Sequence, residues 1–240
     1  MNITYMEHSG FYVEMSTADF LFDYFKGTLP ARDEKKPLLV FVSHRHHDHY
    51  NPAIFELYHE YPNTKYILSD DIPENEYRKE ALYSITKISE NETRTFAITE
   101  EETIQIETLH STDEGVAFLI TYEDQKIYHA GDLNLWIWEG ESADYNGTMR
   151  RDYFVELEKL RDREIDVAFV PLDPRQETDA FLGLESFLSY TRSKHIFPMH
   201  TWGNYDIIED FLHKHPKYES NIKKIIHAGQ HFVIEDKKIT

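Results

Sequence analysis

The pattern of hydrophobic and polar positions in the first half of the chain is that of a β-rich protein. Short apolar runs alternate with turns rich in charged residues or glycine, which predicts β-strands. The predicted strands are residues 11–15, 20–23, 38–42, 65–69, 85–88, 93–98, 103–109, 116–122 and 126–129. Turn-prone residues between the first two strands predict a hairpin. The unbroken apolar run of the third strand is typical of a buried strand.

Helices and short strands alternate in the second half. The predicted helices are about 149–163, 182–192 and 205–214, the strands are 167–170 and 195–197, and a hairpin of 224–226 with 232–235 ends the chain. Two further helices are predicted in the first half. Asn51 can cap a helix that begins at Pro52 and ends before Pro62. A polar helix is expected at 73–83.

Strand-rich blocks mixed with helices that must cover them predict an α/β (α+β) fold. Two sheets packed face to face with helices outside each would form a four-layer sandwich. A single doubly wound sheet is compatible with the same periodicity. The chain contains no linker, internal repeat or low-complexity tract, so residues 1–240 are predicted to form one domain.

Composition narrows the classes of function. The formal charge is −19 and the basic residues do not cluster, which disfavours a nucleic-acid partner. No cysteine is present, which excludes disulfides, thiolate catalysis and cysteine-bound zinc. The N-terminus lacks the basic and apolar regions of a signal peptide, and no run approaches the ~20 apolar residues of a membrane span. A cytoplasmic protein without a membrane span is therefore predicted.

A histidine-rich loop follows the buried strand 38–42. It contains His44, His46, His47, Asp48 and His49, and imidazole and carboxylate both bind zinc or manganese well. Alternate residues of an extended segment point the same way, so His44 and His46 can bind one ion together. Asp48 and His49 follow the turn and can face a second ion. The alternative is a solvated loop, but four histidines within six positions favour a metal site.

Three later positions can supply the remaining ligands. His110 follows the predicted strand 103–109, Asp132 lies just past another predicted strand, and His200 comes three residues after a third. Each of them alone is more often a structural residue. Because loops after successive strands each offer a ligand, the three residues together favour a metal site more strongly than each does alone.

The order and spacing of these residues resemble the metallo-β-lactamase superfamily across nearly the whole chain. The motifs are His44-x-His46-x-Asp48-His49, His110, Gly131-Asp132 and Pro198-x-His200. The resemblance implies an αβ/βα sandwich with a dinuclear site. It also implies that one ion is bound by His44, His46 and His110, the other by Asp48, His49 and His200, and both by Asp132.

The start of the chain is similar to one branch of that superfamily. His8-Ser9-Gly10-Phe11 and Phe22-Asp23 are similar to the ascorbate-phosphate lactonase and N-acyl phosphatidylethanolamine phospholipase D enzymes. That branch usually carries Asp-Pro where this chain has Asp23-Tyr24. His8 and Asp23 are candidates for orienting a metal ligand, with plain strand-end residues as the alternative.

The resemblance implies a hydrolase that uses two divalent ions, with zinc expected and manganese as the alternative. A metal-bridging hydroxide would attack a carbonyl or phosphoryl centre. Asp48 and Asp132 are the candidate catalytic residues, because Asp48 can also move a proton and Asp132 would bridge the ions. The expected substrate is a small anionic ester, either a phosphodiester or a lactone. A nuclease of the same superfamily and a non-catalytic metal-binding sensor stay open as alternatives.

Candidate substrate contacts lie beside the predicted ligands. Trp136 and Trp138 follow Asp132, and Trp202 follows His200, so all three belong to loops next to the site. They can line a cleft or cap the core. Arg175, beyond the strand 167–170, can bind an anionic group of a small-molecule substrate or lie on the surface.

Overall fold

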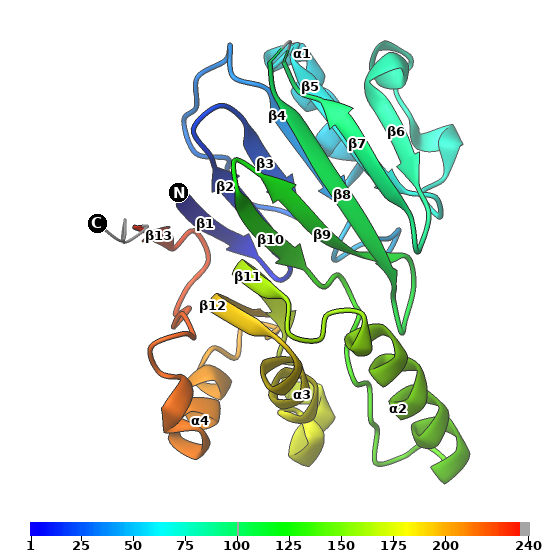
Figure 1. Cartoon of the computed structure of the whole chain (residues 1–240). Coiled ribbons are helices and arrows are strands. Elements are labelled where there is room, and N and C mark those ends of the chain that lie inside the picture. Colours follow the sequence, from blue (N-terminus) through cyan, green and yellow to red (C-terminus); the bar gives the residue numbers. More distant parts are fainter. Residues whose placement is uncertain (100, 236–240) are drawn as a thin grey trace. The chain divides into compact units, whose positions relative to one another are not determined.

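The computed structural model describes residues 1–99 and 101–235 and contains two β-sheets (Figure 1). One sheet has seven strands in the order β13-β1-β2-β3-β4-β5-β6, and the other has six in the order β12-β11-β10-β9-β8-β7. The expected fold class, α/β with two sheets, is confirmed. The single doubly wound sheet is excluded.

The chain divides into two compact units. One comprises Met1–Lys87 with the described residues from His227 onward, and the other comprises Ile88–Ile226. The expectation that residues 1–240 form one domain stays a prediction. Within the residues that the structure describes, no helix is both long enough and apolar enough to cross a membrane.

The first unit is built on the seven-stranded sheet. Its strands are β1 (Asn2–Glu7), β2 (Gly10–Glu14), β3 (Asp19–Phe22), β4 (Leu38–Val42), β5 (Thr64–Ser69), β6 (Ile85–Ile88) and β13 (His231–Val233). The expected hairpin is confirmed, because β2 and β3 pair in antiparallel fashion. β3, β4 and β5 are parallel neighbours. Their carboxyl ends therefore meet at one edge of the sheet.

β4 is buried along its whole length, as its apolar run predicts. Val40 and Val42 belong to an apolar cluster with Tyr66 and Phe55 on one face of the sheet. On the other face, Phe41 stacks on Phe22 with ring centroids 4.9 Å apart. Burial on both faces holds the strand rigidly. The loop that follows β4 thus begins from a fixed point.

The helical segments of the first unit are short. The helix expected after Asn51 is present as η1 (Pro52–Glu56) and α1 (Leu57–Glu60), and the Asn51 side chain accepts a hydrogen bond from the Ala53 N–H at 2.9 Å. The polar helix predicted at 73–83 was wrong. The chain there forms two 3₁₀ turns, η2 (Glu74–Glu76) and η3 (Lys79–Ser84). Only Ala81 is buried in them, so no apolar stripe stabilises an α-helix.

The second unit is built on the six-stranded sheet. Its strands are β7 (Thr93–Ala97), β8 (Thr103–His110), β9 (Val116–Tyr122), β10 (Gln125–His129), β11 (Glu164–Pro171) and β12 (Arg192–Met199). β7 to β10 form an antiparallel meander, whereas β10, β11 and β12 are parallel. Its helical segments are α2 (Ala143–Glu158), η4 (Pro174–Asp179), α3 (Leu182–Tyr190), α4 (Asp206–Lys214) and η5 (Pro216–Tyr218).

α2 begins earlier than its apolar spacing predicts. Ser142 caps the helix by accepting the Tyr145 N–H at 3.1 Å, and the first turns that follow are largely exposed. The first buried side chain is Tyr153, whose hydroxyl donates to the Gly183 carbonyl of α3 at 2.9 Å. The apolar pattern therefore marks the packed half of the helix and misses its solvated start.

The hairpin predicted at the end of the chain was wrong. Residues 224–226 form no strand, and β13 pairs in antiparallel fashion with β1. Gly229, with φ 76°, turns the chain and donates its N–H to the Tyr5 carbonyl at 2.8 Å. β1 has no counterpart among the predicted strands, so the partner of the last strand was missing from the prediction.

Candidate metal centre

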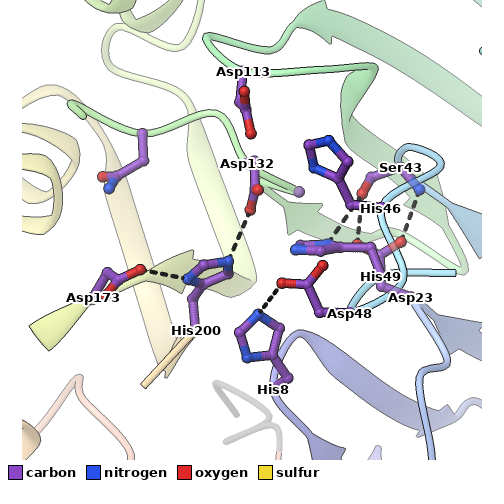
Figure 2. A network of polar contacts seen from close by, with 12 residues as sticks. His8, Asp23, Ser43, His46, Asp48, His49, Asp113, Asp132, Asp173 and His200 are labelled. Carbon is purple, nitrogen blue, oxygen red and sulfur yellow. Dashed lines mark hydrogen bonds and ion pairs between the residues drawn. The ribbon is translucent and has the colours of Figure 1, made fainter. Parts of the chain in front are cut away.

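A buried carboxylate anchors the histidine-rich loop in the first unit. Asp23 directly follows β3, beside the end of β4, and accepts hydrogen bonds from the Ser43 N–H at 2.7 Å and the Ser43 hydroxyl at 2.6 Å. It also accepts the Nδ1–H of His49 at 2.7 Å (Figure 2). Asp23 and His49 are fully buried. This contact fixes the ring of His49 and leaves its Nε2 pointing away from Asp23.

The predicted ligands of the loop lie together. Nε2 of His44 is 3.1 Å from Nδ1 of His46, and the rings of His44 and His49 are 4.1 Å apart. Ligand atoms of His8, Asp48 and His49 lie within 4.8 Å of one another. The first unit thus gathers three imidazoles and a carboxylate of the motif. His47, on the non-ligand position, has an 86% exposed side chain.

Asp48 carries a negative charge in this cluster. Burial raises its pKa, but the hydrogen bond from His8 and the charges of His49 and His8 outweigh burial and hold the pKa well below its usual range. Nε2 of His8 lies 3.2 Å from Oδ2 of Asp48 (Figure 2). The ionised carboxylate is the form that binds a cation.

A similar pair lies in the second unit. The Nδ1–H of His200, just after β12, donates to Oδ2 of Asp173 at 2.8 Å, and Nε2 of His200 lies 3.4 Å from Oδ1 of Asp132 (Figure 2). All three side chains are buried. A carboxylate on Nδ1 that directs Nε2 toward a ligand position is the usual arrangement around histidines that bind metals.

Asp173 is more than the partner of His200. Its carboxylate also accepts Nη2 of Arg175 at 2.6 Å and the Trp202 indole N–H at 3.3 Å. Burial raises the pKa of Asp173, but the hydrogen bonds from His200 and Arg175 outweigh it and lower the pKa to about 2. Asp173 was not predicted in this role. Asp173 lies two residues after β11, and Asp23 lies directly after β3. A carboxylate just past a parallel strand is the sequence signal that could have identified both.

Among the described residues, no group of candidate metal ligands includes His110. The imidazole of His110 is half exposed and pairs with Glu90, while its backbone N–H donates to Glu156 at 3.1 Å. Asp113, three residues further on, instead places a carboxylate oxygen within 4.8 Å of one of Asp132. Asp113 was missed because Asp113-Glu114-Gly115 has the composition of a turn. His110 as a ligand stays a prediction.

The tryptophans and Arg175 surround the buried residues of the second unit. Trp136 and Trp138 lie parallel with centroids 6.0 Å apart, and the Trp136 N–H donates to the Asp132 carbonyl at 2.8 Å. Trp202 is half exposed, with its ring edge-on to that of His200 at 5.7 Å. Trp136, Trp138 and Arg175 line one pocket with Asp132.

Backbone strain marks several of these positions. Four non-glycine residues of the two clusters have left-handed backbone, with φ 57° at His8, 40° at Asp23, 64° at His200 and 53° at Trp202. Such conformations cost free energy and persist where surrounding contacts enforce them. In both clusters these residues lie beside buried carboxylates and imidazoles.

A comparison with models of protein families identifies one domain in the chain. The model of the beta-lactamase superfamily domain matches residues 2–146. No curated protein sequence matches the chain.

Solved structures share the fold. Igni18, a metallo hydrolase from the archaeon Ignicoccus hospitalis, is 18% identical with a TM-score of 0.61 over 98% of this chain and 99% of that chain. CmlA, a diiron β-hydroxylase from Streptomyces venezuelae, is 11% identical with a TM-score of 0.62 over 97% of this chain and 54% of that chain. The short form of human tRNase Z is 13% identical with a TM-score of 0.53 over 98% of this chain and 100% of that chain. At these identities the likeness shows the fold alone.

Proposed function

Since the chain belongs to the β-lactamase superfamily, whose domain model matches more than half of it, we propose that it is a metal-dependent hydrolase. The observation that carries the proposal is the carboxylate-held imidazole that occurs twice. Asp23 holds Nδ1 of His49 at 2.7 Å and Asp173 holds Nδ1 of His200 at 2.8 Å. Two buried histidines oriented in this way are typical of metal ligands.

The donor atoms fit divalent zinc or manganese. Nitrogen and carboxylate oxygen are the donors in both clusters, and the chain has no cysteine. We propose two ions, with zinc expected and manganese as the alternative. The proposed ligands are His44, His46 and His110 for one ion, Asp48, His49 and His200 for the other, and Asp132 for both.

Asp48 and Asp132 are the proposed catalytic residues, and neighbouring side chains hold both in place. When bound, divalent ions make water a better nucleophile near neutral pH and stabilise negative charge on the substrate. Asp48 is ionised and its Oδ2 lies 3.2 Å from Nε2 of His8. Its proposed second role is to move a proton during the reaction. Asp132 is buried and held by its own loop, because the Trp136 N–H donates to its carbonyl. The contact with His8 orients the Asp48 carboxylate, and the Trp136 contact holds the backbone at Asp132, before a substrate arrives.

The substrate that we propose is a small anionic ester, either a phosphodiester or a lactone. Trp136, Trp138, Trp202 and Arg175 are the proposed contacts, and the last of these supplies a positive charge. The motifs at His8 and Asp23 further support the branch of ascorbate-phosphate lactonase and N-acyl phosphatidylethanolamine phospholipase D. A cytoplasmic location is part of the same proposal.

A hydrolysis assay with a matched variant tests the function. Protein loaded with zinc or manganese is given bis(4-nitrophenyl) phosphate and a panel of lactones, before and after removal of metal by a chelator. We expect metal-dependent turnover that His44→Ala/His46→Ala abolishes and that His59→Ala, a change at an exposed histidine, leaves intact. Turnover that survives the double change would refute the proposal.

The same assay separates the alternatives. A nuclease would cleave RNA or DNA faster than small diesters, which the charge of −19 opposes. A non-catalytic sensor would bind metal with a defined stoichiometry but hydrolyse none of the substrates.

A further inference from the structure

A pocket in the second unit combines aromatic side chains with one basic and two acidic side chains. It has a volume of about 230 Å³, and its walls include Asp132, Trp136, Trp138, Tyr145, Met149 and Arg175. Tyr145 and Met149 come from the exposed first turns of α2, whereas the two tryptophans belong to the loop after Asp132. Concave sites that combine aromatic surface with placed polar groups are characteristic of small-molecule binding.

Arg175 is held rigidly at this pocket. Its Nε and Nη2 donate to Oδ2 of Asp173 at 2.9 and 2.6 Å, and its backbone N–H donates to Oδ1 at 2.8 Å. The guanidinium carbon lies 4.5 Å from the ring centroid of Trp202 and 5.9 Å from that of Trp138. These contacts restrict the rotamers of Arg175 before a ligand arrives. Ligand binding therefore costs less side-chain entropy than it would at an unrestrained surface arginine.

Part of the Arg175 guanidinium remains available. Its side chain is 49% exposed, and Nη1 has no hydrogen-bond partner among the described residues. An arginine with one edge bound to a buried carboxylate can still donate from its other edge to a second anion.

The tryptophans next to it favour a flat apolar group. The indole planes of Trp136 and Trp138 differ by only 2°, and Trp136 is 95% buried and hydrogen-bonded to the Asp132 carbonyl. The buried Trp136 ring supports the partly exposed Trp138 ring, which gives a planar ligand a surface to pack against at small entropic cost. The carboxylates of Asp113 and Asp132 line the same pocket and repel an anion, which leaves Arg175 as its partner.

We infer that this pocket recognises an anion attached to a flat apolar group, an aryl carboxylate or an aryl phosphate, as part of the substrate or product. The inference rests on the proposed function, because Asp132 is a proposed ligand and lines the same pocket. It adds the substrate class: an ester that carries an aromatic ring beside a negative charge.

Binding of simple probes to metal-loaded protein tests the inference. Calorimetry would compare benzoate and phenyl phosphate with benzyl alcohol, which lacks the charge, and with acetate, which lacks the ring. We expect an aryl anion to bind roughly tenfold or more tightly than either control. Arg175→Met should abolish the advantage over benzyl alcohol, and Trp138→Leu should abolish the advantage over acetate.

Arg161→Met is the matched control. Arg161 also pairs with a carboxylate, Glu158, at 2.6 Å and lies 4.3 Å from the ring centroid of Tyr190, but it does not line the pocket. This variant should still bind aryl anions more tightly than benzyl alcohol and more tightly than acetate. Equal binding of benzoate and benzyl alcohol, or an unchanged ratio in Arg175→Met, would overturn the inference.

Metal content, measured in the same samples, separates two further outcomes. If Arg175→Met loses metal and weakens all four probes equally, Arg175 acts only by positioning Asp173, and the inference fails. If the probes discriminate as expected but no ester is hydrolysed, the proposed function fails while the pocket stands.

Discussion

Oδ2 of Asp23 lies 2.7 Å from Nδ1 of His49, and both side chains are fully buried. The two residues are 26 positions apart in sequence, but Asp23 directly follows β3 and the His49 loop follows the adjacent parallel strand β4. Parallel pairing therefore brings a carboxylate to Nδ1 of His49, and Nε2 is the nitrogen that we propose binds metal. The relationship between Asp173 and His200 repeats this chemistry at the ends of β11 and β12.

The first prediction concerns Asp23→Asn. The amide keeps the size of the side chain but holds the His49 ring without the negative charge, so Nε2, the nitrogen that we propose binds metal, becomes less basic. We expect zinc affinity to fall roughly 10–100-fold. Competition with a chromophoric chelator measures it, and an unchanged affinity in a folded variant would show that Asp23 does not support a ligand.

The second prediction concerns Asp173 and acid stability of the metal-free protein. The folded-state pKa of Asp173 is depressed from 3.8 to about 2, so its contribution to stability is present above pH 4 and is lost as pH falls toward 2. The contribution is about 2 kcal/mol. Asp173→Asn should be less stable than wild type at pH 6, and the difference should shrink by pH 2.5 in urea unfolding. A difference that does not depend on pH would contradict the assignment.

The third prediction concerns Gly183, at the start of α3. A Cβ added there would lie 1.8 Å from Oδ1 of Asn134, whose Nδ2 donates to Gln176 at 3.0 Å. Gly183→Ala must displace this buried amide and should cost about 1–3 kcal/mol. Gly147→Ala in the exposed part of α2 meets no atom within 4 Å and should stabilise by about 0.5–1 kcal/mol. Urea unfolding measures both, and equal effects would refute the packing argument.

The fourth prediction concerns the buried ion pair of Arg32 and Asp19. Nε of Arg32 lies 3.1 Å from Oδ2 of Asp19, with side chains 1% and 2% exposed. Arg32→Met leaves the buried carboxylate with Lys36 as its remaining cation, so we expect a loss of about 3 kcal/mol. Arg78→Met removes the exposed pair with Glu56 and should cost less than about 1 kcal/mol. Similar losses from both variants would show that burial does not set the strength of the pair.

The parts of the fold that could be predicted depend on local pattern. β4 and the histidine-rich loop were predicted because an apolar run and a dense motif are each visible within ten residues. The pairing of β13 with β1 was not, since it joins opposite ends of the chain and β1 alternates too weakly to be separated from its neighbours. The helix predicted at 73–83 failed because its spacing lacks an apolar face, as the burial of Ala81 alone shows.

The candidate site divides in the same way. The positions of His44, His46, Asp48 and His49 in one cluster follow from their adjacency in sequence. The direction in which a side chain points at a strand end cannot be predicted from sequence adjacency, because it depends on partners distant in sequence. Glu90, which pairs with His110, is such a partner. Asp173 could have been proposed from its place after a parallel strand, but only the structure shows that it contacts His200 and Arg175.

Metal stoichiometry tests the central claim most directly. Protein reconstituted with zinc, freed of excess metal and analysed for its elements should hold about two equivalents. The His44→Ala/His46→Ala and Asp132→Ala variants should hold fewer, while His59→Ala should match the wild type. A folded wild-type protein that binds no zinc or manganese would contradict the account.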